Sequence, residues 1–95
     1  MKSGLAVWYE KAYECWRKLA EEGNIHACEA LGEMYREGLS VKQDYEKAAD
    51  LFWKSWTAGG EAEGYDEGKV NYDKLIEKGK IPVDYAPKEV TFEEK

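Results

Sequence analysis

The chain has 95 residues, a formal net charge of −6 and a pI near 4.8. This length fits one domain that hides only about 60–65% of the surface exposed by the unfolded chain, so four Trp residues must supply much of a thin core. The 14 basic residues are scattered among 20 acidic ones, which argues against nucleic-acid binding because that interaction needs clustered Lys and Arg. A basic protein surface is a better match, although the same charge can serve solubility alone.

Targeting and cysteine signals favour the cytoplasm. The apolar run before Glu10 is too short for a signal peptide, and the sequence has no stretch of about 18 apolar residues that would span a membrane. Cys15 and Cys28 each stand within a helical pattern, at a position that suits a small apolar residue. We therefore expect a cytoplasmic protein without a membrane segment, in which both cysteines are reduced core thiols.

Helical patterns dominate the first part of the chain. A first helix is predicted over about residues 4–22, ended by Gly23-Asn24. A second helix is marked by one apolar stripe, namely Ala27, Ala30, Leu31, Met34 and Tyr35. It should end at Gly38, which suits a left-handed cap, and Asp44 is placed to accept hydrogen bonds from the first amides of a third helix. The buried side of this third helix is marked by Tyr45, Ala48, Phe52 and Trp56.

A fourth helix is predicted over about residues 61–78, where glycines weaken the pattern. Gly64 and Gly68 each cost about 1 kcal/mol relative to Ala in a helix interior. The alternative for this region is a loop followed by a short final helix. In both cases the helical domain is expected to cover residues 1–79.

The C-terminal tail, residues 80–95, is predicted to be extended. Pro82 and Pro87 exclude a regular helix. Residues 83–85 and 90–92 are rich in β-branched and aromatic types, which fits extended segments that lie across the helices.

The sequence repeats itself with an offset of 36 residues. Tyr9-Glu10-Lys11-Ala12 recurs identically as Tyr45-Glu46-Lys47-Ala48. The register then holds for further pairs, namely Glu14 with Asp50, Trp16 with Phe52, Lys18 with Lys54, Gly23 with Gly59 and Gly32 with Gly68. Such self-similarity is typical of helical repeats whose units bury their apolar faces against one another.

One segment carries the pattern of a known repeat: Ala27, Leu31-Gly32, Met34-Tyr35, Gly38, Val41, Asp44 and Lys47-Ala48. This pattern resembles the Sel1-like repeat, with one complete copy over about 27–60 and the back half of another over about 5–23. The resemblance implies an all-α fold, namely a short, tetratricopeptide-like solenoid of about four antiparallel helices with an extended C-terminal tail. It also implies that the helix before Gly38 lines the concave side.

Several residues depart from the family pattern. Ser40 replaces the second glycine of the loop, and Ser55 and Trp56 stand where the family usually has small alanines. Glu67 stands where the counterpart of Leu31 should be. We interpret Trp56 as a sign that regular stacking ends there. In disulfide-rich members of the family Cys28 would fit one cysteine slot, but the other slot holds an alanine, which supports reduced thiols.

No catalytic or metal-binding constellation is recognisable. His26 is the single histidine, and Cys28, two residues further on, points elsewhere on the same helix. The serines have no base nearby. We therefore expect a non-enzymatic protein with no cofactor and no metal. A hydrolase is the least favoured alternative, raised only because some repeat proteins of this kind have been described as binding antibiotic-like substrates.

Partner-binding candidates fall into three groups. An acidic ridge is predicted opposite the core stripe of the second helix, unless it is an ordinary solvated face: Glu29, Glu33 and Glu37, with Arg36 between them. Trp53 occupies a slot matched by Arg17, so it is either an exposed hot spot or a ring packed under the tail. A second acidic cluster is either a docking loop or the solvated start of a helix: Glu61, Glu63, Asp66 and Glu67.

These features predict a protein–protein interaction module that binds a basic protein surface. Its small size and its charge favour an inhibitor or antidote, either a bacterial immunity protein or a phage-type inhibitor of a basic, nucleic-acid-handling defence enzyme. The alternative is a self-associating structural or adaptor subunit, a homodimer formed through the Trp8 end or the Trp56 end, because about two repeats are few for a solenoid core.

Overall fold

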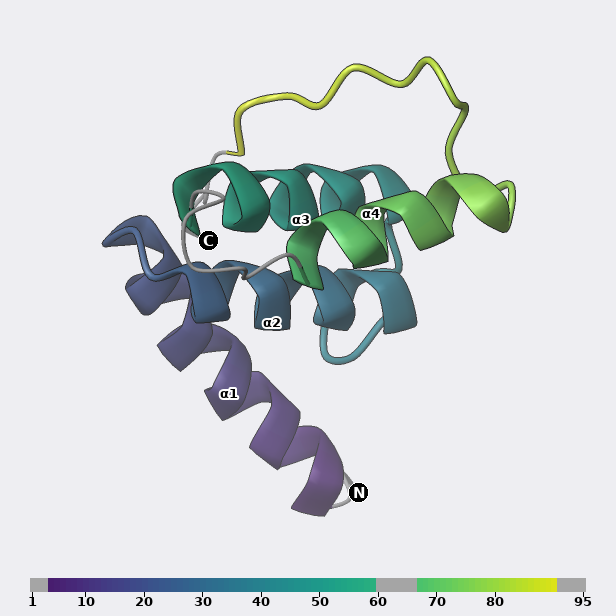
Figure 1. Cartoon of the computed structure of the whole chain (residues 1–95). Helices are drawn as coiled ribbons and strands as arrows, with labels where there is room; N and C mark the ends of the chain where they lie inside the picture. Colours follow the sequence, from purple (N-terminus) through teal and green to yellow (C-terminus); the bar gives the residue numbers. More distant parts are fainter. Residues whose placement is uncertain (1–3, 60–66, 91–95) are drawn as a thin grey trace.

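Four helices form the described part of the chain in the computed structural model, which describes residues 4–59 and 67–90 (Figure 1). The helices are α1 (Gly4–Glu21), α2 (Ile25–Glu37), α3 (Tyr45–Gly59) and α4 (Glu67–Glu77), and the described residues contain no strand. The predicted all-α fold and its first three helices are confirmed. The predicted fourth helix is confirmed over Glu67–Glu77, and its predicted first part, residues 61–66, lies outside the described residues.

The ends of α2 and α3 are fixed by local hydrogen bonds. The Asn24 side chain accepts a hydrogen bond from the Ala27 amide at 3.0 Å and so caps the start of α2. Gly38 ends the helix with φ at 72°, in the left-handed region that glycine adopts without strain. The Asp44 carboxylate then accepts a hydrogen bond from the Lys47 amide at 3.0 Å. The capping roles predicted for Gly38 and Asp44 are confirmed.

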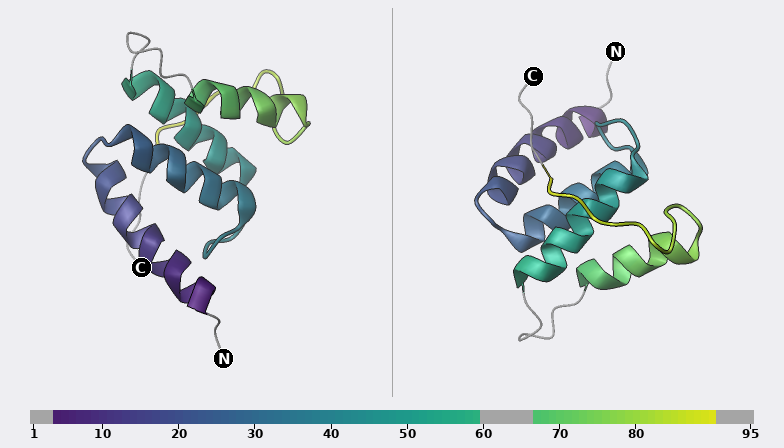
Figure 2. Two further views of the ribbon diagram at one scale, coloured as in Figure 1. Left: turned by 60° about the horizontal axis from the view of Figure 1, so that its bottom comes forward. Right: turned by 90° about the horizontal axis from the view of Figure 1, so that it is seen from above.

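Successive helices run in roughly opposite directions (Figure 1), and α3 lies between α2 and α4, as the right-hand view of Figure 2 shows. The helix α2 in turn packs on both α1 and α3. Phe52 of α3 is fully buried at the centre of this arrangement. A Cβ atom on Gly32 would lie 2.7 Å from the Phe52 ring, and one on Gly68 would collide with the Phe52 carbonyl oxygen. The two glycines, one repeat apart, therefore let α2 and α4 approach α3 closely.

The C-terminal segment crosses the outer side of α3, as the right-hand view of Figure 2 shows. Ile81 and Val90 are buried at its two ends. The Tyr85 hydroxyl donates a hydrogen bond to the Asp50 carboxylate at 2.7 Å, and the Lys88 amide donates to the same oxygen at 3.0 Å. The tail therefore packs on the helices along this length.

The prediction that residues 83–85 are extended is wrong for Val83 and Asp84. The Tyr85 amide donates to the Pro82 carbonyl oxygen at 3.1 Å, so this segment closes a turn between α4 and the tail. The extended course begins only at Tyr85 and continues to Val90. Of the other predicted extended segment, residues 91 and 92 lie outside the described residues.

The two cysteines have different environments and are not bonded to each other. Cys28 is buried between the helices, as predicted, and burial raises the pKa of its thiol. Cys15 is exposed, so its prediction as a core residue is wrong. The cause is that α1 packs mainly on α2, and no described helix packs on the side of α1 that carries Cys15.

Candidate protein-binding surfaces

The predicted acidic ridge on α2 is divided by the packing of α4. Glu33 and Glu37 are exposed, whereas Glu29 is only 8% exposed. The side-chain amide of Asn71, on α4, donates a hydrogen bond to the Glu29 carboxylate at 3.4 Å. The prediction of an exposed ridge is therefore wrong for Glu29, because Asn71 of α4 lies against its side chain. The exposed acidic residues of α2 are Glu33 and Glu37.

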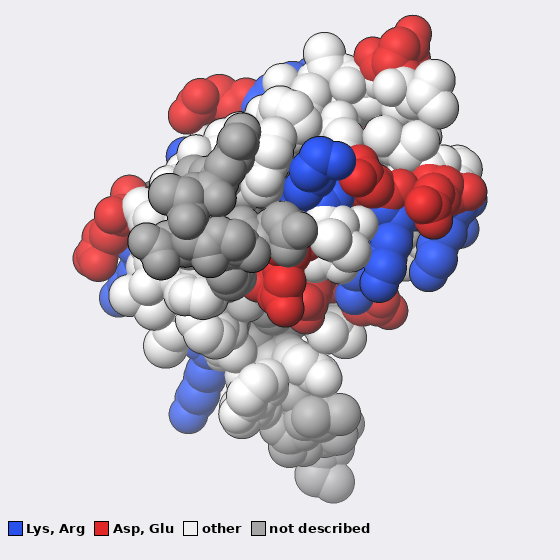
Figure 3. Space-filling view, in the orientation of Figure 1, with Lys and Arg blue, Asp and Glu red and all other residues white. Residues whose placement is uncertain are grey.

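Arg36 moderates the charge of this surface. Its guanidinium forms an ion pair with Glu37 at 3.0 Å and lies 5.9 Å from the centre of the Phe52 ring. Figure 3 shows acidic and basic side chains interleaved over α4 and α2 on this face, with no continuous acidic area. Glu33 is the other exposed acidic residue of α2.

Trp53 combines features of both interpretations offered by the sequence. Its side chain is 36% exposed, and its ring centre lies 5.2 Å from those of Trp56 and Tyr72. It also lines a hollow between α3 and the tail, together with Pro87 and Lys88. The ring is thus fixed by aromatic contacts and still presents one edge to solvent. Of the predicted second acidic cluster, Glu61, Glu63 and Asp66 lie outside the described residues, and Glu67 is exposed at the start of α4.

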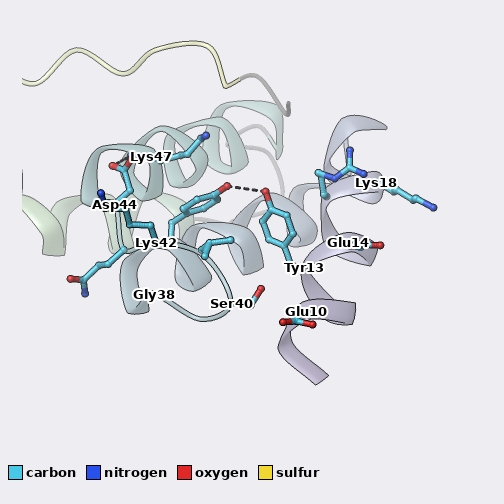
Figure 4. A pocket seen from close by; sticks show the side chains of 13 residues that line it. Glu10, Tyr13, Glu14, Lys18, Gly38, Ser40, Lys42, Asp44 and Lys47 are labelled. Atoms are coloured by element: carbon cyan, nitrogen blue, oxygen red, sulfur yellow. Dashed lines mark hydrogen bonds between the residues drawn. The ribbon is translucent and has the colours of Figure 1, made fainter. Parts of the chain in front are cut away.

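An open groove of about 1100 Å³ separates α1 from the loop between α2 and α3 (Figure 4). Tyr13 of α1 and Tyr35 of α2 face each other in this groove, with their hydroxyl oxygens 2.8 Å apart. Burial and the hydrogen bond with Tyr13 raise the pKa of Tyr35 well above its ordinary value, so Tyr35 stays neutral at physiological pH. The Lys47 ammonium lies 5.2 Å from the centre of the Tyr35 ring.

The walls of the groove carry both signs of charge. Its acidic residues are Glu10, Glu14 and Asp44, and its basic residues are Arg17, Lys18, Lys42 and Lys47. Arg17 is also held by an ion pair with Glu21 at 2.8 Å. Sequence reasoning missed this groove. One difference between the two copies of the repeat could have pointed to it, because Tyr13, which lines the groove, stands where the second copy has the small residue Ala49. The surface suits a polar protein segment of mixed charge.

The groups that could support chemistry are kept apart. His26 is exposed in the first turn of α2, whereas Cys28 is buried beneath the same turn. Within the described ranges, no group of three or more His, Cys, Asp or Glu side chains is placed to hold a metal ion. In the same ranges no helix combines the length and the apolar character that crossing a membrane requires.

The stacked antiparallel helices, with glycines at their closest approaches, define a short all-α solenoid. The family model of the Sel1 repeat matches residues 8–24 and 25–55, which together make up just over half of the chain. The chain belongs to the Sel1 repeat family, as the sequence pattern predicted. Repeats of this family generally mediate protein–protein interaction and are generally not enzymes. Neither the curated proteins nor the solved structures contain a significant match to the chain.

Proposed function

We propose that this chain is a non-enzymatic inhibitor or antidote that binds a basic surface of a partner protein through the exposed side of α2. The observation that carries the proposal is the exposure of Glu33 and Glu37, one helical turn apart on a helix held between α1 and α3. Carboxylates at this spacing repel each other, so a Lys or Arg from a partner would relieve the repulsion. The net charge of −6 would add long-range attraction to a basic protein.

The packing around α2 favours binding with little ordering cost. Leu31 and Gly32 are buried against α3, and Glu29 is held beside α4, so the helix backbone is fixed from both sides. A surface already rigid before association loses little conformational freedom on binding. Arg36, paired with Glu37, would orient that carboxylate. These properties suit a tight inhibitor of a toxin or of a basic defence enzyme, in a bacterial or phage-type setting.

The other predicted contact residues have different support. Trp53 stays in the proposed contact set, because its exposed edge is held in place by Trp56 and Tyr72 and a fixed aromatic edge suits a binding hot spot. Glu61, Glu63 and Asp66 stay as predictions from the sequence. Self-association, the alternative function, draws on a different surface, the outward side of α1.

Affinity capture from a lysate of the source organism would test the charge-guided proposal. The bait variant carries Glu33→Gln and Glu37→Gln. The control variant carries Glu22→Gln and Asp84→Asn, which removes the same number of charges from exposed turns elsewhere. We expect the native chain and the control to capture one basic protein at low salt and to lose it at high salt.

Binding of the purified partner then decides the proposal. We expect the α2 variant to bind at least about tenfold more weakly than the control variant, with most of the change at low salt. Equal binding by the two variants would exclude the exposed side of α2. A captured partner that is acidic, or that is retained at high salt, would contradict charge-guided binding.

A further inference from the structure

One side of α1 is an apolar stripe that no other described element covers. Its members follow helical spacing: Trp8, Ala12, Cys15 and Leu19. Trp8 is 59% exposed and Leu19 is 38% exposed, and Cys15 is exposed between them. The adjoining side of α1 packs into the core that α1 shares with α2, and its residues are Tyr9, Tyr13, Trp16 and Ala20. We call the exposed set the α1 stripe.

The second copy of the repeat shows how the residues that match the α1 stripe are packed on α3. The residues 36 positions after Ala12, Cys15 and Leu19 are Ala48, Leu51 and Ser55 on α3, and all three are 0% exposed, whereas the match of Trp8 is the exposed Asp44 just before α3. Leu51 packs in the cluster that contains Cys28 and Leu31 of α2. The equivalent side of α3 is thus covered by a helix. Ala12, Cys15 and Leu19 of the α1 stripe have the same places in the repeat, and no described helix covers them.

We propose that two copies of this chain pair through their α1 stripes, with the two α1 helices antiparallel about a two-fold axis. A second copy cannot offer α2, because Ala27, Leu31 and Met34 are already buried in its own core. The α4 end is also a poor match, since exposed Glu67 stands where α2 has Leu31. Among the described helices, α1 carries more exposed large apolar residues than α3, which has Trp53, or α4, which has Val70, so we assign the contact of a second copy to the α1 stripe.

The stripe is self-complementary in an antiparallel pair. Its large side chains, Trp8 and Leu19, lie at the two ends, and its small side chains, Ala12 and Cys15, lie in the middle. A two-fold axis near the centre places each Trp8 beside Leu19 of the other copy, while the small central residues let the helices approach. A two-fold contact uses up both stripes, so the assembly closes at two copies.

The contact area and charge set the expected strength. One helix pair buries less than the roughly 1,200 Å² of a standard stable interface, so we expect a dissociation constant in the micromolar range. Lys11 and Lys18 are exposed beside the stripe. Salt would screen these lysines and leave the apolar contact intact, so high salt should not weaken the dimer. This response is opposite to that of the charge-guided partner, so the two proposals can fail separately.

Sedimentation velocity of the reduced chain over a wide concentration range would test the dimer. We expect a concentration-dependent shift from one copy to two. Leu19→Glu should weaken the association at least about tenfold, because it places two carboxylates in the contact. The matched control is Val70→Glu on α4, where a side chain 43% exposed receives the same charge, and it should associate like the native chain. Thermal unfolding of both variants would show that each is folded.

The thiol of Cys15 provides a second and independent measurement. In the dimer Cys15 should react slowly with a maleimide at high protein concentration and quickly on dilution, whereas buried Cys28 should stay slow throughout. A chain that sediments as one copy at every concentration would overturn the proposal. Association that survives Leu19→Glu, or that is lost in Val70→Glu, would also overturn it. Protection of Cys15 that does not change with concentration would assign the stripe to another segment of the same chain, and would overturn it as well.

Discussion

The helices α1 and α3 are two copies of the same repeat element, and their surroundings differ. Phe52 of α3 is fully buried, while the matching Trp16 of α1 is only half-buried. Leu51 is likewise buried and the matching Cys15 is exposed. The cause is the number of neighbours: α3 packs between α2 and α4, whereas α1 packs mainly on α2. In a solenoid, the same apolar pattern is a core or a surface according to what stacks on it.

The tail adds a further difference between the two copies. Asp50 of α3 is 9% exposed and accepts hydrogen bonds from Tyr85 and from the Lys88 amide. Glu14, its match on α1, is exposed and lines the open groove. The tail therefore closes the outer side of α3, and the corresponding side of α1 stays open. An exposed groove beside α1 is the result.

The largest expected effect is a core truncation at matched positions. Phe52→Ala should lower the free energy of unfolding by about 3–5 kcal/mol, because it removes a fully buried ring that packs against Gly32 of α2. Trp16→Ala should cost clearly less, since part of the Trp16 side chain is already in water. Urea unfolding of the two variants would measure both values. Equal losses would break the comparison and would mean that α1 is as enclosed as α3.

A smaller effect is expected where the tail is anchored. Asp50→Ala should lower the free energy of unfolding by about 1.5–3 kcal/mol, because the Tyr85 hydroxyl and the Lys88 amide lose a charged acceptor. Glu14→Ala should change it by less than about 0.5 kcal/mol, as is usual for an exposed position. Hydrogen exchange at the Lys88 amide should accelerate only in the Asp50 variant. An unchanged exchange rate would contradict an anchored tail.

Alkaline pH would weaken the same anchor more gradually. Burial, together with the hydrogen bond to Asp50, raises the pKa of Tyr85 above its ordinary value. The folded state therefore keeps the Tyr85 proton when the unfolded state has begun to lose it, so the stability from this contact is complete below about pH 10 and declines above it. Unfolding experiments across this range should show a shallower decline for Tyr85→Phe than for the native chain. Parallel declines would exclude Tyr85 as a source.

The sequence predicted what depends on local spacing. Periodic apolar residues located the first three helices, and Gly38 and Asp44 marked their ends, because caps and helix periodicity are set within a few residues. The repeat offset also placed Gly32 and Gly68 in equivalent roles, and both admit a close neighbour of α3. The family assignment depended on the same local pattern and is confirmed.

Features that depend on packing at a distance could not be predicted in the same way. Glu29 is buried because Asn71, 42 residues away, lies against it. The exposure of Cys15 depends on which helices stack on α1. The groove depends on the path of the loop that contains Ser40, whose φ of 65° is unusual for a residue other than glycine. Each of these requires the three-dimensional arrangement and not the pattern of one helix.

The smallest expected effect has the opposite sign and concerns the side of α3 that matches the α1 stripe. Among the described residues, the Ser55 hydroxyl is buried without a hydrogen-bond partner. An unpaired buried hydroxyl costs free energy, so Ser55→Ala should raise the free energy of unfolding by up to about 1 kcal/mol. The control is Thr57→Ala, whose hydroxyl donates to the Trp53 carbonyl oxygen at 3.0 Å on the exposed side of α3, and it should give no such gain.

Urea unfolding of both variants would separate the outcomes. A higher free energy of unfolding for Ser55→Ala alone would mean that apolar packing against α2 stabilises the buried side of α3. The α1 stripe, in which Leu19 matches Ser55, would then be equally suited to an apolar contact with another helix. A loss of about 1 kcal/mol or more would show that the hydroxyl has a partner in the folded protein. In that case burial of the polar group would be part of how α3 differs from α1, and the two sides would not be equivalent.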